Sequence, residues 1–284
     1  MREKFFYIEP AKARELLAQT QTMKPAKRGI ESFVYLIGDY AVLTTSRIKL
    51  RNVATRDDDL AWFDELIETL MRLHEQGVAA VPILGYCYEP DSENGAGYIF
   101  QPRARGEELY EDAVIKEYKR RKASYFFPSE IDPKEYILSR TSFISRVPQE
   151  HFDKFIGDMI AIMEHDILID CNGKSNFFYH EAAGFQFIDL DSHTDYKYGL
   201  DERRCGSKEL AAYAGFVPCH TALALDKKAI AKLGRRETQQ FARDNMAIFE
   251  KCKAAMLRNG IPEALVSRSV KFLTLYGARF FHKL

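Results

Sequence analysis

The sequence lacks the features that would place it in a membrane or on a nucleic acid. No apolar run approaches the roughly 18 residues that a membrane-spanning helix requires. Forty-one basic and 41 acidic residues cancel, so no overall field favours nucleic acid or an anionic membrane surface. We therefore expect neither nucleic acid nor a membrane among the partners of this chain.

Paired cysteines are also missing. The five cysteines are scattered, odd in number and free of Cys-x-x-Cys spacing, so free thiols are expected and structural zinc is not. The start, Met1-Arg2-Glu3-Lys4, is charged and no small-residue cleavage site follows it, which predicts that no signal peptide is present. These features predict a cytoplasmic protein, although a bacterial effector injected into a host would have the same composition.

The length and the apolar content indicate a folded chain with more than one compact part. At 284 residues, 46% of them apolar and 13% aromatic, the chain suits two lobes with a substantial core. We find no internal repeat and no low-complexity segment. The residue patterns predict a strand-rich front, residues 1–104, and a helical rear, residues 105–284, with one small hairpin.

The front half carries clear element signals. A short helix is expected over residues 8–19, with Pro10 in its first turn. Strands are expected over the ranges Phe33–Ile37 and Tyr40–Thr45, joined at Gly38-Asp39, which is a hairpin signal.

An amphipathic helix and two more strands follow. Apolar residues at helical spacing predict a helix over 60–74 that Asp57-Asp58-Asp59 precede and Gly77 ends. Further strands are expected over 81–84 and 98–100.

The rear half is clear except in residues 107–147, to which the pattern assigns no structure. A strongly apolar helix face runs from Phe152 to Met163 and predicts a core helix. Two aromatic runs, 177–179 and 185–188, flank Ala182-Ala183-Gly184 and predict a hairpin. Helices are expected near 237–258 and 262–281, separated by Gly260.

One stretch carries the chemistry. Asp170, Asn176 and Asp189 stand on short loops next to apolar, strand-like runs. This set suits phosphoryl transfer, in which one carboxylate orients the proton of the attacking hydroxyl. An amide oxygen and a second carboxylate hold the magnesium ion that bridges the nucleotide phosphates.

The element order and these motifs resemble the protein-kinase-like fold, especially its aminoglycoside-phosphotransferase-type branch, over about residues 25–200. The resemblance implies an α+β, two-lobed fold with a small strand-rich N-lobe, 1–104, and a larger helical C-lobe, 105–284. It also implies ATP and Mg²⁺ as cofactors, Asp170 as the catalytic aspartate, and Asn176 and Asp189 as magnesium ligands. The separation of Asn176 and Asp189, 13 residues, matches the family spacing for a minimal hairpin.

The catalytic loop departs from the family pattern at several positions. Asn176 stands six residues after Asp170, where family kinases have five, and Leu168 replaces the family histidine. Leu190-Asp191 replaces Phe-Gly, so no flipping activation switch is implied. Lys174 would reach the transferring phosphate, although a solvated loop lysine fits the sequence equally well.

The nucleotide-binding cation is the weakest correspondence. Glu68 resembles the helix glutamate that orients the family's strand lysine, with Glu65 as the fallback, but Thr44 stands where that lysine is expected. Lys49, or else Arg47, would have to replace it.

Three further segments complete the comparison with the family. No Gly-x-Gly-x-x-Gly occurs, and 27–32 is the only candidate phosphate-covering loop. Gln101-Pro102-Arg103-Ala104 stands at the position of the adenine-binding hinge. Gly106-Glu107-Glu108-Leu109 then resembles the start of the second lobe.

Several readings stay open. The first is an ATP-dependent phosphotransferase with a hydroxyl acceptor on a small molecule or a protein; the second is a nucleotide- or partner-binding pseudokinase. The third is a helical interaction protein without a nucleotide site, and the fourth a metal-dependent hydrolase using Asp170, Asp189, Asp191 and His193. The sequence indicates neither the acceptor nor the oligomeric state.

Overall fold

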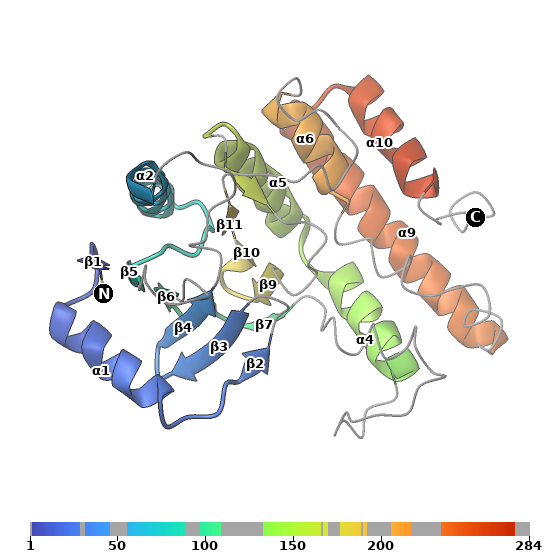
Figure 1. Cartoon of the computed structure of the whole chain (residues 1–284). Coiled ribbons are helices and arrows are strands. Elements are labelled where there is room, and N and C mark those ends of the chain that lie inside the picture. The colour runs from blue at the N-terminus through green and yellow to red at the C-terminus, as the bar shows by residue number, and fades with distance from the viewer. Residues whose placement is uncertain are drawn as a thin grey trace. The chain divides into compact units, whose positions relative to one another are not determined.

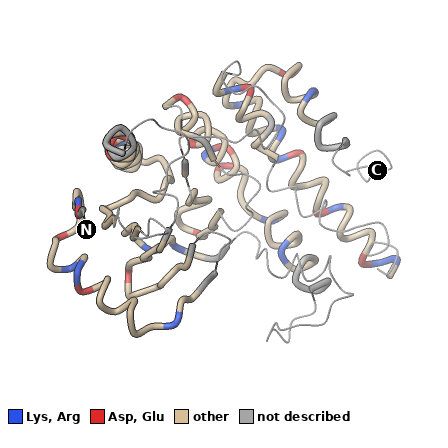
Figure 2. The backbone as a smooth tube through the Cα atoms, in the orientation of Figure 1, with Lys and Arg blue, Asp and Glu red and all other residues tan. Residues whose placement is uncertain are grey.

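The computed structural model describes residues 2–28, 32–45, 56–88, 97–108, 133–165, 167–169, 177–188, 190–191, 206–216 and 234–275. The chain divides into two units, Met1–Arg105 and Gly106–Leu284. Helices and antiparallel strands occur in both, which confirms the predicted α+β class. Residues of both charge signs occur in both units (Figure 2). No helix in the described ranges is long and apolar enough to cross a membrane.

The first unit contains a six-stranded antiparallel sheet with the strand order β1-β5-β6-β4-β3-β2 (Figure 1). Two helices, α1 (Pro10–Thr20) and α2 (Arg56–Glu75), accompany it. The strands are β1 (Arg2–Phe5), β2 (Lys27–Arg28), β3 (Ser32–Ile37), β4 (Tyr40–Thr45), β5 (Gly85–Tyr88) and β6 (Gly97–Pro102).

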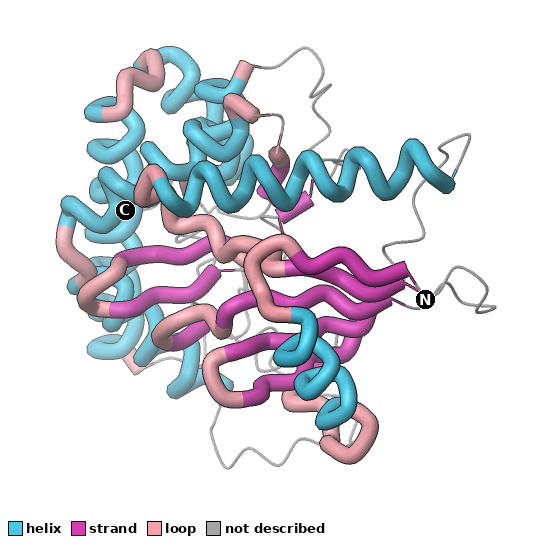
Figure 3. The backbone as a smooth tube through the Cα atoms, turned by 90° about the vertical axis from the view of Figure 1, so that its left-hand side faces the viewer, coloured by secondary structure: helices cyan, strands magenta, loops and turns pink. Residues whose placement is uncertain are grey.

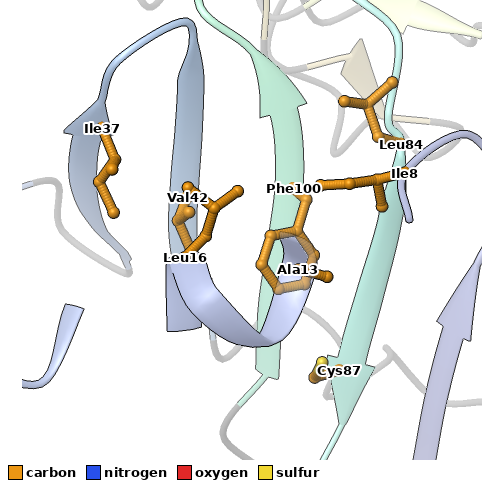
Figure 4. Close-up of a cluster of buried hydrophobic side chains, with 8 residues drawn as sticks. All are labelled: Ile8, Ala13, Leu16, Ile37, Val42, Leu84, Cys87 and Phe100. Atoms are coloured by element: carbon orange, nitrogen blue, oxygen red, sulfur yellow. The ribbon is translucent and has the colours of Figure 1, made fainter. Parts of the chain in front are cut away.

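The two helices lie on opposite faces of this sheet (Figure 3). Directly paired residues share a face, so Val42 and Phe100, which are paired and fully buried, mark one side. These two side chains pack with Ala13 and Leu16 of α1 in the cluster of Figure 4. On the other face, Tyr86 of β5 contacts α2.

The strongest local signals of the front half are confirmed. The β3–β4 hairpin turns at Gly38, whose φ of 57° is a conformation that glycine adopts without strain. Helix α1 has proline in its first turn, as predicted. Helix α2 begins at Arg56, so Asp57-Asp58-Asp59 are part of it rather than preceding it.

Two elements of the sheet differ from the sequence-based expectation. Strand β5 begins at Gly85, so the predicted strand over 81–84 is wrong. Pro82 has no backbone N–H to give to a sheet, and the continuous ladder of β5 with β6 starts at Gly85. The charged N-terminal segment, for which no strand was predicted, forms β1 and pairs with β5 from Arg2↔Tyr88 to Phe5↔Gly85.

The second unit is mainly helical and contains two small sheets, β10-β9-β7 and β11-β8 (Figure 1). Its strands are β7 (Glu107–Glu108), β8 (Leu168–Ile169), β9 (Phe177–His180), β10 (Gly184–Phe187) and β11 (Leu190–Asp191). Its helices are α4 (Pro133–Arg146), α5 (Gln149–Met163), α6 (Ser207–Ala214), α9 (Arg235–Arg258) and α10 (Glu263–Leu275).

Helix α5 is the centre of this unit. All six apolar residues predicted as its core face are buried: Phe152, Phe155, Ile156, Met159, Ile160 and Met163. The helix contacts α6, α9, β8 and β10. The helices predicted near 237–258 and 262–281 correspond to α9 and α10, with Gly260 between them at a φ of 71°. The end predicted for the second lies outside the described residues.

Helix α4, in a segment to which the sequence assigned no structure, is joined to α9 by a polar contact. The Lys251 ammonium donates to the carbonyl oxygens of Ser145 at 2.7 Å and Val147 at 2.6 Å, at the end of α4. A cation satisfies the free carbonyl groups of a helix end. Burial lowers the pKa of this ammonium, opposed by the charges of Cys252 and Glu150.

Candidate functional site

The hairpin β9–β10 is packed onto helix α5 by aromatic rings. Phe177 and Phe187 are direct partners at its open end, with ring centroids 5.7 Å apart. Phe155 of α5 stacks on Phe187 at 5.2 Å and meets Phe177 edge-on at 5.9 Å. All three rings are at most 1% exposed. The open end of the hairpin is therefore rigidly fixed, since close-packed rings resist displacement.

A second, two-stranded ladder lies next to this hairpin in the sequence. Ile169 of β8 is the direct partner of Leu190 of β11, and both side chains are buried. Leu168 pairs with Asp191 in the same ladder. The last residue of β8 and the first residue of β11 are therefore direct partners in the ladder.

Most of the predicted site residues lie outside the described residues: Lys49, Asp170, Lys174, Asn176 and Asp189. The same holds for the alternatives Arg47 and His193. What the structure describes is the frame around them. Ile169 directly precedes Asp170, Phe177 directly follows Asn176, and Leu190 directly follows Asp189.

The other end of the hairpin carries a buried tyrosine. The Tyr179 hydroxyl lies 3.0 Å from Nδ1 of His151 on α5, and its ring meets those of Phe143 and Phe185 edge-on. Burial raises the pKa of the Tyr179 phenol, and the negative charges of Glu181 and Glu150 raise it further. The phenol is therefore harder to ionise than a free tyrosine and does not serve as a base.

Glycine at position 106 is required where the second unit begins. Its φ is 81°, and a Cβ atom there would lie 2.1 Å from the carbonyl oxygen of Tyr179. Only glycine allows β7, which follows directly, to pair with β9 in the register Glu107↔Tyr179. This is the glycine that the sequence matched to the start of the second lobe.

Glu68 is the predicted phosphate-clamp residue that the structure describes. Its side chain on α2 is exposed, and so is that of the fallback, Glu65. The acid of α2 that reaches the sheet is Asp64, whose side chain is 19% exposed. It pairs with Lys4 and accepts a hydrogen bond from the Tyr86 hydroxyl at 3.0 Å.

Sequence reasoning missed Asp64, although a signal for it existed. The apolar stripe of α2 includes Leu60 and Ile67, which stand four residues before and three after Asp64. Residues three or four apart are neighbours on a helix surface, so this spacing puts Asp64 at the margin of the stripe. An acid at that margin can reach the sheet. Charge alone does not distinguish Asp64 from the other acidic residues of the helix.

The side chain of Thr44 lies on the face of strand β4 that is turned away from α2. Thr44 pairs with Tyr98 and its hydroxyl accepts a hydrogen bond from the Phe33 amide at 3.1 Å. It therefore shares the α1 side with Val42, two residues earlier. On the opposite face β4 presents Ala41 and Leu43. The position that the sequence matched to the family lysine thus points away from α2.

Comparison with known proteins finds matches among solved structures. No family model and no curated protein match this sequence. Among solved structures, the chain is similar to one in "WaaP in complex with acyl carrier protein", at 16% identity and a TM-score of 0.35. The alignment covers 96% of this chain and 99% of that chain. A TM-score of this size assigns neither a fold nor an activity to this protein.

Proposed function

We propose that this chain is a kinase-like, ATP-dependent phosphotransferase with a hydroxyl acceptor on a small molecule or a protein. The observation that carries the proposal is the pairing of β8 with β11, because Ile169 and Leu190 are direct partners. Asp170 follows one of them and Asp189 precedes the other. The hairpin that begins directly after Asn176 connects the two strands along the chain, and this order supports a common site for the three predicted positions.

The proposed reaction assigns a role to each of these residues. The acceptor oxygen attacks the γ-phosphorus of ATP, the bond from that phosphorus to the β–γ bridging oxygen breaks, and Asp170 orients or takes the hydroxyl proton. The Asn176 amide oxygen and the Asp189 carboxylate are donors of the kind that magnesium prefers. When bound, the ion neutralises phosphate charge. Within the described residues no cluster of three or more metal-ligating side chains offers another site.

The nucleotide side of the proposal uses the first unit as the N-lobe, 1–104, and the second as the C-lobe, 105–284. Ala41, Leu43 and Ile99 are half-buried on the sheet face opposite α1 and would receive the adenine ring. Glu68 with Lys49 would form the phosphate clamp, and Lys174 would reach the transferring phosphate. Gln101-Pro102-Arg103-Ala104 would bind the adenine edge.

One observation favours the alternative, a pseudokinase that binds nucleotide without transferring phosphate. On the α2-facing side of β4 the structure describes Ala41 and Leu43, neither of which carries a charge. The cation would have to come from Lys49 or Arg47, beyond the strand. Without a cation at the phosphates, transfer is expected to be severely slowed.

Thermal unfolding with and without MgATP tests nucleotide binding. The proposal predicts a magnesium-dependent rise in melting temperature that Asp189→Ala abolishes and that Glu181→Ala, an exposed acid in the hairpin turn, preserves. No rise at millimolar MgATP would exclude the phosphotransferase and the pseudokinase together. It would favour the interaction protein.

Single-turnover phosphate transfer or ATP hydrolysis then separates the first two functions. The expected result is a rate that falls about 100-fold or more in Asp170→Ala, the usual contribution of a general base, with MgATP binding retained. If the wild-type rate equals that of Asp170→Ala, the phosphotransferase is excluded and the pseudokinase is the remaining function of the two.

A further inference from the structure

Strand β1 is tied to a different helix on each of its faces. Glu3 and Lys4 are neighbours in an extended strand, so their side chains point to opposite sides of the sheet. Glu3 accepts a hydrogen bond from Arg14 of α1 at 2.9 Å, and Lys4 forms an ion pair with Asp64 of α2. The N-terminal strand therefore forms one ion pair with α1 and one with α2.

The contact with α2 is better defined than an ordinary surface ion pair. Lys4 and Tyr86 are direct partners across β1 and β5, and both donate to the Asp64 carboxylate. Lys4 reaches Oδ2, while the Tyr86 hydroxyl lies 3.0 Å from Oδ1. Tyr86 is only 3% exposed. Two adjacent strands thus supply one donor each to the two oxygens of a single carboxylate, which fixes where Asp64 stands.

Ring contacts restrain the same three-residue arrangement. Phe63, next to Asp64 on α2, meets the Tyr86 ring edge-on at a centroid distance of 5.2 Å. The Lys4 ammonium also lies 4.9 Å from the centre of the Phe6 ring, which favours the lysine conformation seen here. Asp64 is accordingly a defined polar contact between α2 and the sheet edge, beside the apolar contacts of the helix.

We propose that Lys4 is a positioning residue that holds α2 through Asp64 and so places Glu68 for nucleotide binding. Glu68 stands four residues after Asp64, one helical turn along α2, so a displacement at Asp64 moves it too. The inference rests on the proposed function, in which Glu68 orients the phosphate-binding cation. The N-terminal strand then controls the affinity for MgATP although it supplies no ligand to the nucleotide.

A matched pair of variants tests, without any activity measurement, whether Lys4 holds α2 in place. Lys4→Met and Arg14→Met each remove the basic residue of one ion pair that ties β1 to a helix, α2 for Lys4 and α1 for Arg14. Hydrogen exchange of the α2 amides is expected to rise about fivefold in Lys4→Met, the factor that a half-exposed ion pair supplies at most. Arg14→Met is expected to leave α2 exchange unchanged. Unchanged exchange in Lys4→Met would overturn the inference.

The functional part is tested by the dissociation constant of MgATP in the same full-length variants. Lys4→Met is expected to weaken binding by a similar factor, about fivefold, and Arg14→Met to leave it unchanged. The charge reversal Lys4→Glu combined with Asp64→Lys restores the ion pair but not the carboxylate to which Tyr86 donates, so it is expected to recover part of the α2 protection and of the binding that Lys4→Glu alone loses.

The outcomes separate this inference from the proposed function. If the wild type binds MgATP and Lys4→Met binds it equally well while α2 exchange rises, the positioning role is wrong and the proposed function stands. If the wild type binds no MgATP, the proposed function fails and the role of Lys4 toward nucleotide fails with it. Higher exchange in Lys4→Met, weaker binding and partial rescue by the reversal together support the inference.

Discussion

Helix α5 meets the hairpin β9–β10 through phenylalanine rings, whereas α2 meets the edge of the larger sheet through a carboxylate with two donors. In the first contact Phe155 touches Phe177, Phe185 and Phe187. In the second, Asp64 joins Lys4 and Tyr86. The Asp64 contact thus adds a polar anchor to a helix whose apolar residues, among them Ile67 and Leu70, are also buried.

The difference bears on how easily each contact moves. The strength of an apolar contact follows its buried area and is insensitive to salt or to the charge of one group. An ion pair whose lysine side chain is 50% exposed is weak and screened by salt. The hairpin beside the predicted metal ligands is thus a stable frame, and the Lys4–Asp64 pair is the part of the α2 contact that salt or a change of charge weakens.

The largest expected effect comes from removing a ring of the frame. Phe155→Ala should lower the free energy of unfolding by about 3–5 kcal/mol, because a fully buried aromatic leaves a cavity. Urea unfolding monitored by circular dichroism measures the loss. Phe33→Ala is the control, since Phe33 is 37% exposed on the larger sheet and should cost much less. Equal losses would contradict the stated role of the phenylalanine frame.

A smaller effect is expected at the polar contact. Tyr86→Phe removes one donor from a carboxylate and should cost about 1.5–3 kcal/mol, measured from the urea midpoint at constant slope. Tyr98→Phe is the matched control on the opposite face, where the hydroxyl only meets Gln21 at 3.4 Å. If Tyr98→Phe proves as costly as Tyr86→Phe, Asp64 is not a polar anchor of α2.

The smallest effect is a dependence of stability on alkaline pH at Tyr179. Its folded pKa lies above the ordinary 10.0, so above pH 10 the folded state binds more protons than the unfolded state. The stabilisation is complete below pH 10 and is lost as the pH rises through the folded pKa. The stability difference between wild type and Tyr179→Phe should therefore be constant below pH 10 and shrink above it.

This difference is the quantity to measure, because Lys251 acts in the opposite direction. Its lowered pKa makes the unfolded state bind more protons below pH 10.5, so its contribution rises with pH in that window. This contribution of Lys251 is present in both wild type and Tyr179→Phe, so it cancels when their stabilities are subtracted. A difference that grows above pH 10 would mean that the phenol is easier to ionise in the folded state.

The parts of the fold that the sequence predicted are those with a local cause. The buried face of α5 follows from apolar residues at helical spacing, and the turn at Gly38 follows from glycine between two strand-like runs. Strand β1 carries no such signal, because Arg2, Glu3 and Lys4 are charged and pair only where β5 offers an edge. For the candidate site, sequence alone supplied Asp170, Asn176 and Asp189, and they stay predictions.

By itself the sequence determined the α+β class, the hairpin at 177–187 and the acids available on α2. Only the tertiary structure decided that Asp64 rather than Glu68 contacts the sheet, and that Thr44 lies on the α1 side. The physical reason is that helical spacing and strand alternation state which residues share a face. Which neighbour that face meets depends on strands far away in the chain, and here β1 and β5 supply the donors.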